Sequence, residues 1–454
     1  MLISRSPADG RVIAEYEETT PTRVAADIEQ AASMQRDWET VPISERSKPM
    51  MRLAELLEEN RDDLAVLMAD EMGKPVAQGR GEAEKCAWVC RHYAEQAERI
   101  LADQDIATER TKSYVAFRPL GVVLAVMPWN FPLWQVYRFL APALMAGNAG
   151  ILKHASNVTG CALAIDRLAV EAGFPDGLFR SLVLPSSRVD EILEHPMVVA
   201  ATLTGSDPAG RAVAARAGSL LKKTVLELGG SDPYLVLADA DLDLAATTCS
   251  SARLINGGQS CIAAKRFIVE EPVVERFTEL MADGLSKAVM GDPLSPDTTL
   301  GPMARTDLRD ELHDQVRRSV DSGAELVMGG EVPDRPGAFY PPTLLTGVKE
   351  GMAVYHEETF GPVAAVITAT DLDDAVRIAN DTEFGLGAAI FTADTARGET
   401  VARDRLQAGA TFVNSFVASD PRLPFGGIKM SGYGRELSDI GMMEFLNAKT
   451  VVVA

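Results

Sequence analysis

The sequence predicts an α/β protein with two sheet-containing domains. From about residue 120 onward, short apolar runs rich in β-branched residues alternate with segments whose apolar residues recur at helical spacing. This βαβ alternation is typical of a parallel sheet covered by helices on both faces. At 454 residues the chain also exceeds the size of a single hydrophobic core, so two large domains are expected.

Residues 24–101 are expected to form several helices. Apolar residues follow helical spacing over 50–57 and again over 64–68. The run Gly73-Lys74-Pro75 is expected to break this helical region. A polar, charged stretch at 103–118 then separates the helices from the first sheet.

The first sheet is predicted from five short apolar segments. Strands are expected at 122–127, 149–153, 181–184, 198–203 and 221–226. Helices are expected between them at 158–172, 188–195 and 208–217. Sheets of this kind bind dinucleotides at the carboxyl ends of their strands, so a Rossmann-type cofactor domain is expected.

A second α/β region begins near Gly230. Its expected strands are 234–237, 264–269, 363–368, 388–391 and 410–413, with helices near 241–255, 271–289, 304–321, 372–380 and 395–406. The β-branched run 449–454 and the stretch 103–118 predict a β-strand arm for oligomerisation. The predicted boundaries are 1–102 and 120–229 for the cofactor-binding domain, 230–431 for the catalytic domain, and 103–119 with 432–454 for the oligomerisation or bridging segments.

Composition and charge exclude several classes of protein. The chain has 44 basic and 65 acidic residues, a formal net charge of −21, so nucleic acid and anionic membranes are not expected as partners. Neither a secretory signal nor a run of bilayer length is apparent, and a cytoplasmic protein is expected. The five cysteines form no disulfide framework, and the five histidines show no metal-ligand spacing, so no metal is expected.

The strongest chemical signal is a cysteine preceded by a carboxylate. Cys261 ends the stretch Gly258-Gln259-Ser260-Cys261, and Glu227 begins the upstream run Glu227-Leu228-Gly229-Gly230. A thiol can attack a carbonyl, and a carboxylate can activate the water that releases the acyl group. The segment Pro128-Trp129-Asn130-Phe131-Pro132 adds an amide that can hold an oxyanion. A single cysteine is more often a buried apolar residue, so the argument depends on the three segments together.

These three segments resemble the aldehyde dehydrogenase superfamily. The resemblance covers essentially the entire chain, and the run from Ser260 to Arg266 resembles the short bacterial succinate-semialdehyde dehydrogenases. It implies that Cys261 is the nucleophile, that Asn130 and the backbone N–H of Cys261 form the oxyanion hole, and that Glu227 is the base for hydrolysis. Further motifs of the family are Thr204-Gly205-Ser206-Asp207-Pro208-Ala209-Gly210, Glu357-Glu358-Thr359-Phe360-Gly361-Pro362 and Pro424-Phe425-Gly426-Gly427.

The resemblance also implies a nicotinamide dinucleotide. Lys153 resembles the lysine that holds the adenosine ribose, and Glu358 the residue that binds the nicotinamide ribose. Many members that prefer NAD carry a glutamate three positions after this lysine, where this chain has Ser156. A hydroxyl and a cation suit a 2′-phosphate, so NADP is expected to be preferred, with NAD possible. The expected cofactor-binding residues are Trp129, Lys153, Ser156, Gly205, Ser206, Gly210, Glu358 and Phe360.

The substrate side of the site is predicted from the residues around these motifs. Arg138 resembles an arginine of semialdehyde dehydrogenases that holds a distal carboxylate, and the alternative for it is a structural ion pair. The expected activity is NAD(P)-dependent oxidation of succinate semialdehyde to succinate through a thiohemiacetal and a thioester. Glutarate semialdehyde or a broad range of aldehydes is the alternative substrate, and a non-catalytic binding protein is a remote alternative. A homodimer or homotetramer is expected. The expected substrate-binding residues are Trp134, Arg138, Ser260 and Ser419.

Overall fold

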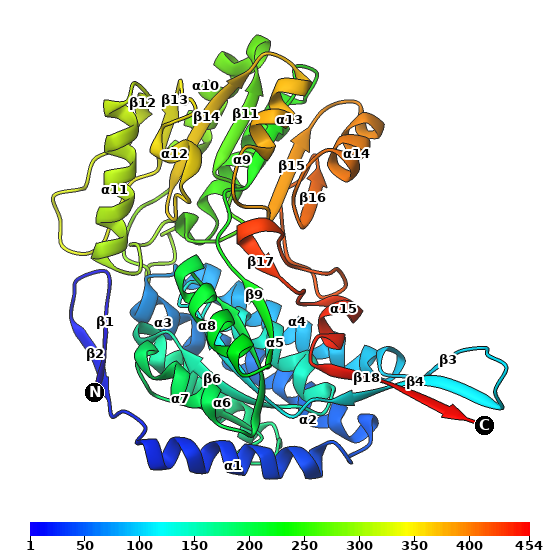
Figure 1. Cartoon of the computed structure of the whole chain (residues 1–454). Coiled ribbons are helices and arrows are strands. Elements are labelled where there is room, and N and C mark those ends of the chain that lie inside the picture. Colours follow the sequence, from blue (N-terminus) through cyan, green and yellow to red (C-terminus); the bar gives the residue numbers. More distant parts are fainter.

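Two large sheets organise the structure, one in each of two lobes (Figure 1). The structure is a computed structural model that describes residues 1–454. In the view of Figure 1 the lower lobe holds the N-terminal helices and the first predicted sheet, and the upper lobe holds the second. Most of the predicted elements are present, and the α/β class is confirmed.

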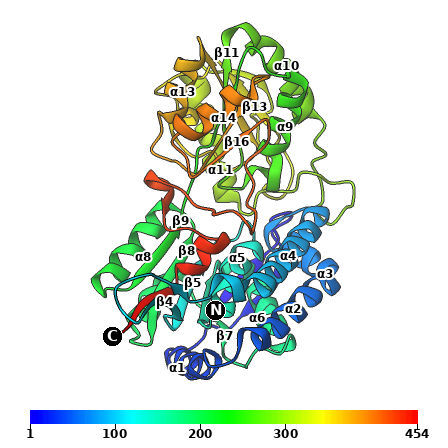
Figure 2. The same ribbon diagram turned by 90° about the vertical axis from the view of Figure 1, so that its right-hand side faces the viewer.

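Helices dominate the chain before residue 101. The hairpin of β1 (Leu2–Arg5) and β2 (Val12–Tyr16), which the sequence did not predict, comes first. The helices are α1 (Pro21–Trp38), α2 (Ile43–Glu59), α3 (Arg61–Met72) and α4 (Val76–Ile100). The predicted break is confirmed, because α3 ends at the left-handed Gly73 (φ 78°) and α4 begins after Pro75. Helices α2, α3 and α4 pack along one side of the lower lobe (Figure 2).

The lower sheet has six strands in the order β17-β9-β8-β5-β6-β7. Its strands are β5 (Val122–Met127), β6 (Ala149–His154), β7 (Phe179–Ser181), β8 (Val198–Thr204), β9 (Lys223–Glu227) and β17 (Gly432–Tyr433). Strands β5 to β9 pair in parallel, as predicted, and β17 pairs antiparallel with β9. Helices connect the strands, and they are α5 (Trp134–Met145), α6 (Thr159–Glu171), α7 (Val189–Glu194) and α8 (Asp207–Ser219).

Two strands of this sheet begin at other residues than predicted. The strand expected at 181–184 overlaps β7 only at Ser181, because the chain beyond it runs beside Thr19, whose hydroxyl accepts from Val183 N–H. The strand expected at 221–226 begins at Lys223. Leu221 instead lies in the turn after α8, with φ 55° and 96% of its surface exposed.

The upper sheet has seven strands in the order β12-β13-β14-β11-β10-β15-β16. Its strands are β10 (Pro233–Val236), β11 (Arg266–Glu270), β12 (Glu325–Met328), β13 (Thr343–Thr346), β14 (Val363–Ala369), β15 (Gly387–Phe391) and β16 (Ala410–Val413). All neighbours pair in parallel except β12 and β13, which the sequence did not predict. The helices are α9 (Leu242–Leu254), α10 (Val274–Ser286), α11 (Thr306–Asp321), α12 (Ala353–His356), α13 (Leu372–Asn380) and α14 (Thr395–Asp404).

Both faces of the upper sheet are buried, as the alternation of elements predicted. Successive residues of β10 point into different hydrophobic clusters, Leu235 into one and Tyr234 and Val236 into the other. A single large cluster forms the core of the lower lobe. None of the helices combines the length and the apolar character needed to cross a bilayer.

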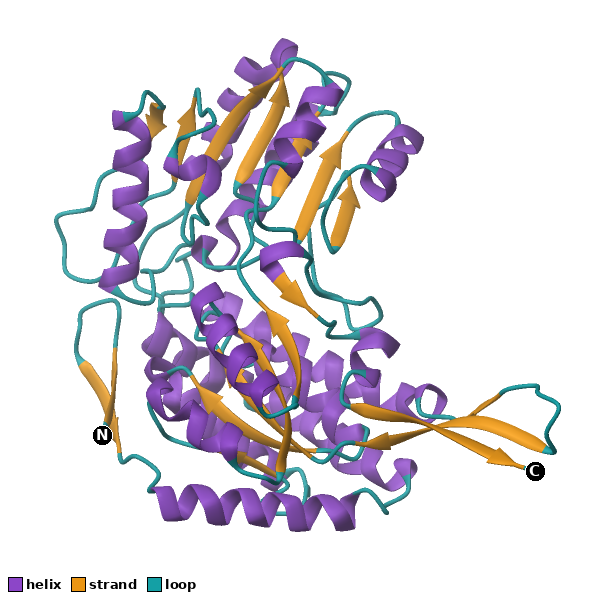
Figure 3. Ribbon diagram, in the orientation of Figure 1, coloured by secondary structure: helices purple, strands orange, loops and turns teal.

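A three-stranded antiparallel sheet projects from the lower lobe as an arm (Figures 1 and 3). Strand β18 (Leu446–Val453) pairs along its whole length with β4 (Lys112–Pro119), which also pairs with β3 (Gln104–Asp105). Helix α15 (Ser438–Met443) leads into β18. The two segments predicted to form an arm are therefore neighbours, and the role of the arm in oligomerisation stays a prediction.

Candidate active site

The site lies where the two lobes meet, at the carboxyl ends of the strands of the lower sheet. The strand order reverses between β5 and β8, because the chain continues from β5 to β6 on one side and returns to β8 on the other. Such a reversal leaves a crevice beyond the strand ends, where α/β sheets bind their ligands. The segment Pro128–Pro132 follows β5, and Gly205 and Ser206 follow β8. The predicted motifs therefore meet at one edge.

A cavity of about 760 Å³ opens at this edge and is lined by residues of both lobes. Five of the predicted cofactor residues line it. The rings of Trp129 and Phe360 meet edge to face across it, with centroids 5.7 Å apart. The five residues are Trp129, Gly205, Ser206, Glu358 and Phe360.

Gly210, the other glycine of this motif, does not line the cavity but lies behind its wall. It lies in the first turn of α8, and a Cβ atom there would stand 2.5 Å from Cδ2 of Leu228. A side chain at this position would push against Leu228, so glycine suits the close packing of the helix against the segment after β9. The N-terminus of α8 lines the cavity through Ser206 and Asp207. Helix N-termini present free N–H groups and favour anions, which suits the phosphates of the expected dinucleotide.

Lys153 and Ser156 lie at the end of β6, outside the wall of this cavity. Lys153 is buried without a carboxylate partner, and burial lowers the pKa of its ammonium to about 8. Between them, the buried His154 contacts the carbonyl of Pro132 through Nε2 at 2.8 Å and that of Met127 through Nδ1 at 3.2 Å. This histidine, which the sequence did not single out, ties β6 to the loop that carries Asn130.

Cys261 stands at the junction of this cavity with a second one, because it lines both. Upstream of it, Asn256, Gly257 and Gly258 all have positive φ, between 53° and 76°. A Cβ atom at Gly258 would collide with the backbone of Gly361, so this turn requires glycine. The turn delivers the cysteine into the crevice.

The two groups predicted to form the oxyanion hole each keep a free N–H hydrogen. Nδ2 of Asn130 donates one hydrogen to the carbonyl of Gln259 at 3.1 Å, and its second hydrogen is free. The backbone N–H of Cys261 has no hydrogen-bond partner. Asn256 fixes the loop of Asn130, because its Nδ2 donates to the Asn130 carbonyl at 2.7 Å.

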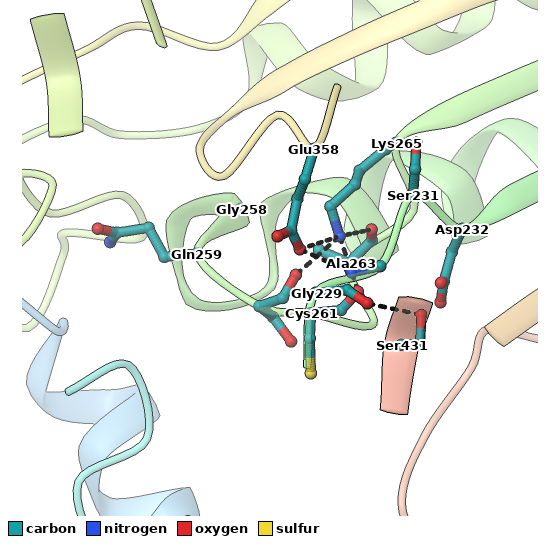
Figure 4. A network of polar contacts seen from close by, with 12 residues as sticks. Gly229, Ser231, Asp232, Gly258, Gln259, Cys261, Ala263, Lys265, Glu358 and Ser431 are labelled. Carbon is teal, nitrogen blue, oxygen red and sulfur yellow. Dashed lines mark hydrogen bonds and ion pairs between the residues drawn. The ribbon is translucent and has the colours of Figure 1, made fainter. Parts of the chain in front are cut away.

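A buried lysine holds the segment around the cysteine (Figure 4). Nζ of Lys265 donates to the carbonyls of Ser260, Cys261 and Ala263 at 3.0, 2.7 and 3.1 Å. It also pairs with Oε1 of Glu358 at 3.5 Å. In Figure 4 the sulfur of Cys261 points away from this network. Lys265 therefore joins the segment of Cys261 to a carboxylate of the first cavity.

The thiol of Cys261 is neutral in this environment. Burial raises its pKa to about 12, and the positive charges of Arg138 and Lys265 oppose this shift.

Glu227 is buried at the end of β9 and lines neither cavity. Neither of its carboxylate oxygens has a hydrogen-bond partner. Burial raises its pKa well above the usual value, while Arg138 opposes the shift. A side chain at Gly426 would collide with this carboxylate, so the Gly426-Gly427 motif leaves room for it.

The second cavity has a volume of about 390 Å³, and all four predicted substrate residues line it. Arg138 is 1% exposed, and its Nε forms an ion pair with the equally buried Glu436. Its Nη2 donates to Thr204 Oγ1 at 3.2 Å, and its guanidinium lies 4.6 Å from the centroid of the Phe425 ring. The ion pair that the sequence left open as the alternative is thus present.

Comparison with known proteins decides the family. The model of the aldehyde dehydrogenase family matches residues 2–451. The chain belongs to this family. It is 46% identical over 449 residues to a probable NADP(+) succinate-semialdehyde dehydrogenase of Synechocystis sp., covering 99% of both chains. It is 48% identical over 455 residues to the NADP(+) succinate-semialdehyde dehydrogenase 1 of Mycobacterium tuberculosis, again covering 99% of both.

A solved structure supports the same conclusion about the fold. The succinic semialdehyde dehydrogenase from Streptococcus pyogenes in complex with NADP+ superposes on this aldehyde dehydrogenase with a TM-score of 0.97. The two are 36% identical, and the match covers 100% of both chains. The expected superfamily and the aldehyde dehydrogenase-like fold are confirmed.

Sequence motifs missed several residues that shape the site of this enzyme. Glu82 accepts from the backbone N–H groups of Leu133 and Trp134 at 2.8 and 2.9 Å, which fixes the start of α5, and it pairs with Lys74. Glu82 lies in α4 and Lys74 in the break before it, and charged side chains in such sequence are usually solvated. The other missed residues are Lys85, Asn256, Lys265 and Glu436.

Proposed function

We propose that this enzyme oxidises succinate semialdehyde to succinate with NADP as the preferred cofactor. One observation carries the proposal, which is the place of Cys261 between two cavities. The larger cavity has the volume and the helix N-terminus that a dinucleotide needs, and the smaller one has room for a short aldehyde. The activities for which the similar proteins are named agree with this assignment.

The residues of the first cavity fit the dinucleotide. Glu358, whose Oε1 accepts from Gly230 N–H at 3.0 Å, offers carboxylate oxygens to the ribose hydroxyls. Lys153 and the neutral Ser156 suit a 2′-phosphate better than a carboxylate would, which favours NADP. NAD remains a possible second cofactor. When bound, the nicotinamide ring supplies the acceptor for the hydride that leaves the substrate carbon.

The roles of Cys261 and Asn130 follow from their places, and that of Glu227 from the family resemblance. The Cys261 thiolate attacks the aldehyde carbon, and the free N–H groups of Asn130 and Cys261 stabilise the oxyanion of the thiohemiacetal. Loss of hydride leaves a thioester on Cys261. Glu227 takes a proton from water, and the hydroxide attacks the thioester carbon. A carbon–oxygen bond forms there and the carbon–sulfur bond breaks. The products are the carboxylic acid and free Cys261.

A panel of aldehydes and cofactors tests the assignment. Initial rates would be measured for succinate semialdehyde, glutarate semialdehyde and butanal, each with NADP and with NAD. The highest kcat/KM is expected for succinate semialdehyde with NADP. Equal values for butanal would refute recognition of a carboxylate, and higher values with NAD would refute the cofactor preference. A higher value for glutarate semialdehyde would favour the alternative substrate.

The remaining expectations are also proposals. We infer that the enzyme works in the cytoplasm as a homodimer or homotetramer. The projecting arm of β18, β4 and β3 supports an oligomer, because an isolated three-stranded arm buries little apolar surface.

A further inference from the structure

A buried lysine that takes no part in the proposed chemistry lies behind the segment of Cys261. Lys265 is 1% exposed and lines neither cavity, so it does not act on the substrate directly. Its ammonium has three hydrogens and donates to three backbone carbonyls, those of Ser260, Cys261 and Ala263. Because residues 259–265 form neither helix nor strand, these bonds hold a segment that regular structure does not hold.

The contact of Lys265 with Ser260 decides where the next N–H group points. The peptide bond between Ser260 and Cys261 is trans, and a planar trans peptide holds its C=O and its N–H in opposite directions. Nζ of Lys265 at 3.0 Å and the N–H of Ala263 at 3.1 Å both donate to the Ser260 carbonyl, which fills its two acceptor sites. The N–H of Cys261 is therefore directed away from Lys265, and it has no hydrogen-bond partner.

The lysine also strengthens this N–H group as a donor. A hydrogen bond from a cation is stronger than one between neutral groups, and it draws electron density toward the carbonyl oxygen. The N–H of the same peptide unit then carries more positive charge, because linked hydrogen bonds polarise one another. The sulfur of Cys261 also points away from Lys265 (Figure 4). The cation thus acts on the reacting atoms through the backbone.

Two carboxylates balance the buried charge of Lys265. Oε1 of Glu358 lies 3.5 Å from its Nζ, and Asp232 is buried nearby at 1% exposure. Burial lowers the pKa of Lys265, and the charges of Glu358 and Asp232 oppose this shift. Backbone N–H groups hold both carboxylates, that of Gly230 on Glu358 and that of Gly387 on Asp232, each at 3.0 Å. The surroundings therefore support a cation at this place.

We propose that Lys265 is a positioning residue of the oxyanion hole, which directs and polarises the N–H of Cys261 through the Ser260 carbonyl. When the sulfur–carbon bond forms, the electron pair of the aldehyde carbonyl moves onto its oxygen, and this N–H group stabilises the charge there. The other donor, Asn130, is held by a different contact, to the Gln259 carbonyl. The inference rests on the proposed function, since it concerns the attack of Cys261 in that same site.

Two reactions of the same thiol, both run without NADP, test the proposal in Lys265→Met. Acylation by p-nitrophenyl acetate forms a sulfur–carbon bond, passes through an oxyanion and releases p-nitrophenolate. Alkylation by iodoacetamide forms a sulfur–carbon bond, releases iodide and creates no oxyanion. The variant should slow acylation by roughly 10- to 100-fold more than alkylation. Since both reactions need the thiolate, their ratio cancels any change in the pKa of Cys261.

The matched control is Lys222→Met. Nζ of Lys222 also donates to two backbone carbonyls, those of Leu193 and His195, and this lysine lines neither cavity. Its removal should leave the ratio of acylation to alkylation unchanged. A lysine that merely stabilised the fold would behave in the same way at position 265.

The outcomes separate this inference from the proposed function. If Cys261→Ala still releases a burst of p-nitrophenolate, the proposed nucleophile is wrong. If the burst requires Cys261 and the ratio in Lys265→Met equals that of the unaltered enzyme, Lys265 does not position the oxyanion hole. An equal slowing of both reactions gives that same unchanged ratio and overturns the proposal.

A measurement on the unaltered enzyme covers the case in which Lys265→Met does not fold. Because burial lowers the pKa of Lys265, it loses its proton at a lower pH than a solvated lysine. The side chain then loses its charge and one donor hydrogen, so the ratio of acylation to alkylation should fall roughly 3-fold or more between about pH 7 and pH 10.5. A ratio that stays level would overturn the proposal. The charged or titratable groups that act on this ammonium are Glu358, Asp232, Arg253 and Cys261.

Discussion

Cys261 differs from the other four cysteines because its side chain alone is not fully buried. We predict that Cys261→Ala abolishes turnover, to below roughly one-thousandth, because no other group there can form the thioester. NADP binding should persist. Rates of NADPH formation and cofactor titration of the same variant check this.

Cys249 supplies the control for this prediction. It is 0% exposed in the core of the upper lobe, and burial raises its pKa well above the usual value. Cys249→Ala should therefore keep its activity. Appreciable turnover in Cys261→Ala would contradict the proposed mechanism.

Glu227 has no hydrogen-bond partner, and its buried carboxyl has a raised pKa. We predict that Glu227→Gln slows thioester hydrolysis by roughly 100- to 10,000-fold while acylation continues, so rapid mixing should show a burst of NADPH and then a slow rate. In the unaltered enzyme, hydrolysis should slow as pH falls through the raised pKa, because the base then holds its proton. Loss of the burst would mean that Glu227 activates Cys261 instead.

The sequence predicted the site residues that lie together in one short motif. It did not predict contacts between residues that are far apart in the sequence. Trp129 and Asn130 lie in one short segment, so their joint arrival could be predicted. The contact of Lys85 with Ser419 joins positions 334 residues apart, and that of Arg138 with Glu436 joins α5 to the segment before α15. Arg138 and Ser419 were predicted as site residues, but no local pattern identifies Glu436 and Lys85 as their partners.

Amphipathic helices and buried parallel strands could be predicted from the sequence, whereas a fully buried helix and short or exposed strands could not. All twelve residues of α5 are buried, and its polar side chains, such as Gln135 and Arg138, do not form a solvated face that would reveal an amphipathic helix. Strand β12 is short and largely exposed at the sheet edge, and the antiparallel hairpin of β1 and β2 is also short. Buried parallel strands such as β5 were predicted with their exact bounds.

The junction of β6 with the following 3-10 turn is predicted to set the cofactor preference. Ser156 begins that turn (Ser156–Val158), three residues after Lys153. Ser156→Glu would place a carboxylate against a 2′-phosphate, and the ratio of kcat/KM for NADP to that for NAD should fall by roughly 10- to 1000-fold. Ser156→Ala is the matched control and should change the ratio much less. An unchanged ratio in Ser156→Glu would show that this junction does not face the adenosine ribose.

In the whole molecule, the arm is the part whose exposed apolar side chains find no partner within a single chain. Its β18 strand leaves Val452 and Val453 about half exposed, at 53% and 48%, and Ile106 beside β3 is 50% exposed. Apolar side chains on a projecting sheet with open edges are a pairing surface for another copy of the chain. The boundaries predicted for the bridging segments, 103–119 and 432–454, contain all three residues.

We therefore predict that the double variant Val452→Glu, Val453→Glu shifts the chain from a dimer or tetramer to a monomer. The charges would have to be buried without partners in the joined arms, which is costly, whereas a monomer leaves them in water. Light scattering after size-exclusion chromatography measures the mass. Leu221→Asp, which adds a charge at an apolar residue that is 96% exposed and far from the arm in the sequence, should leave the mass unchanged. An unaltered chain that is already monomeric would refute the oligomer, and an oligomer that survives the double variant would place the contact between copies elsewhere than the arm.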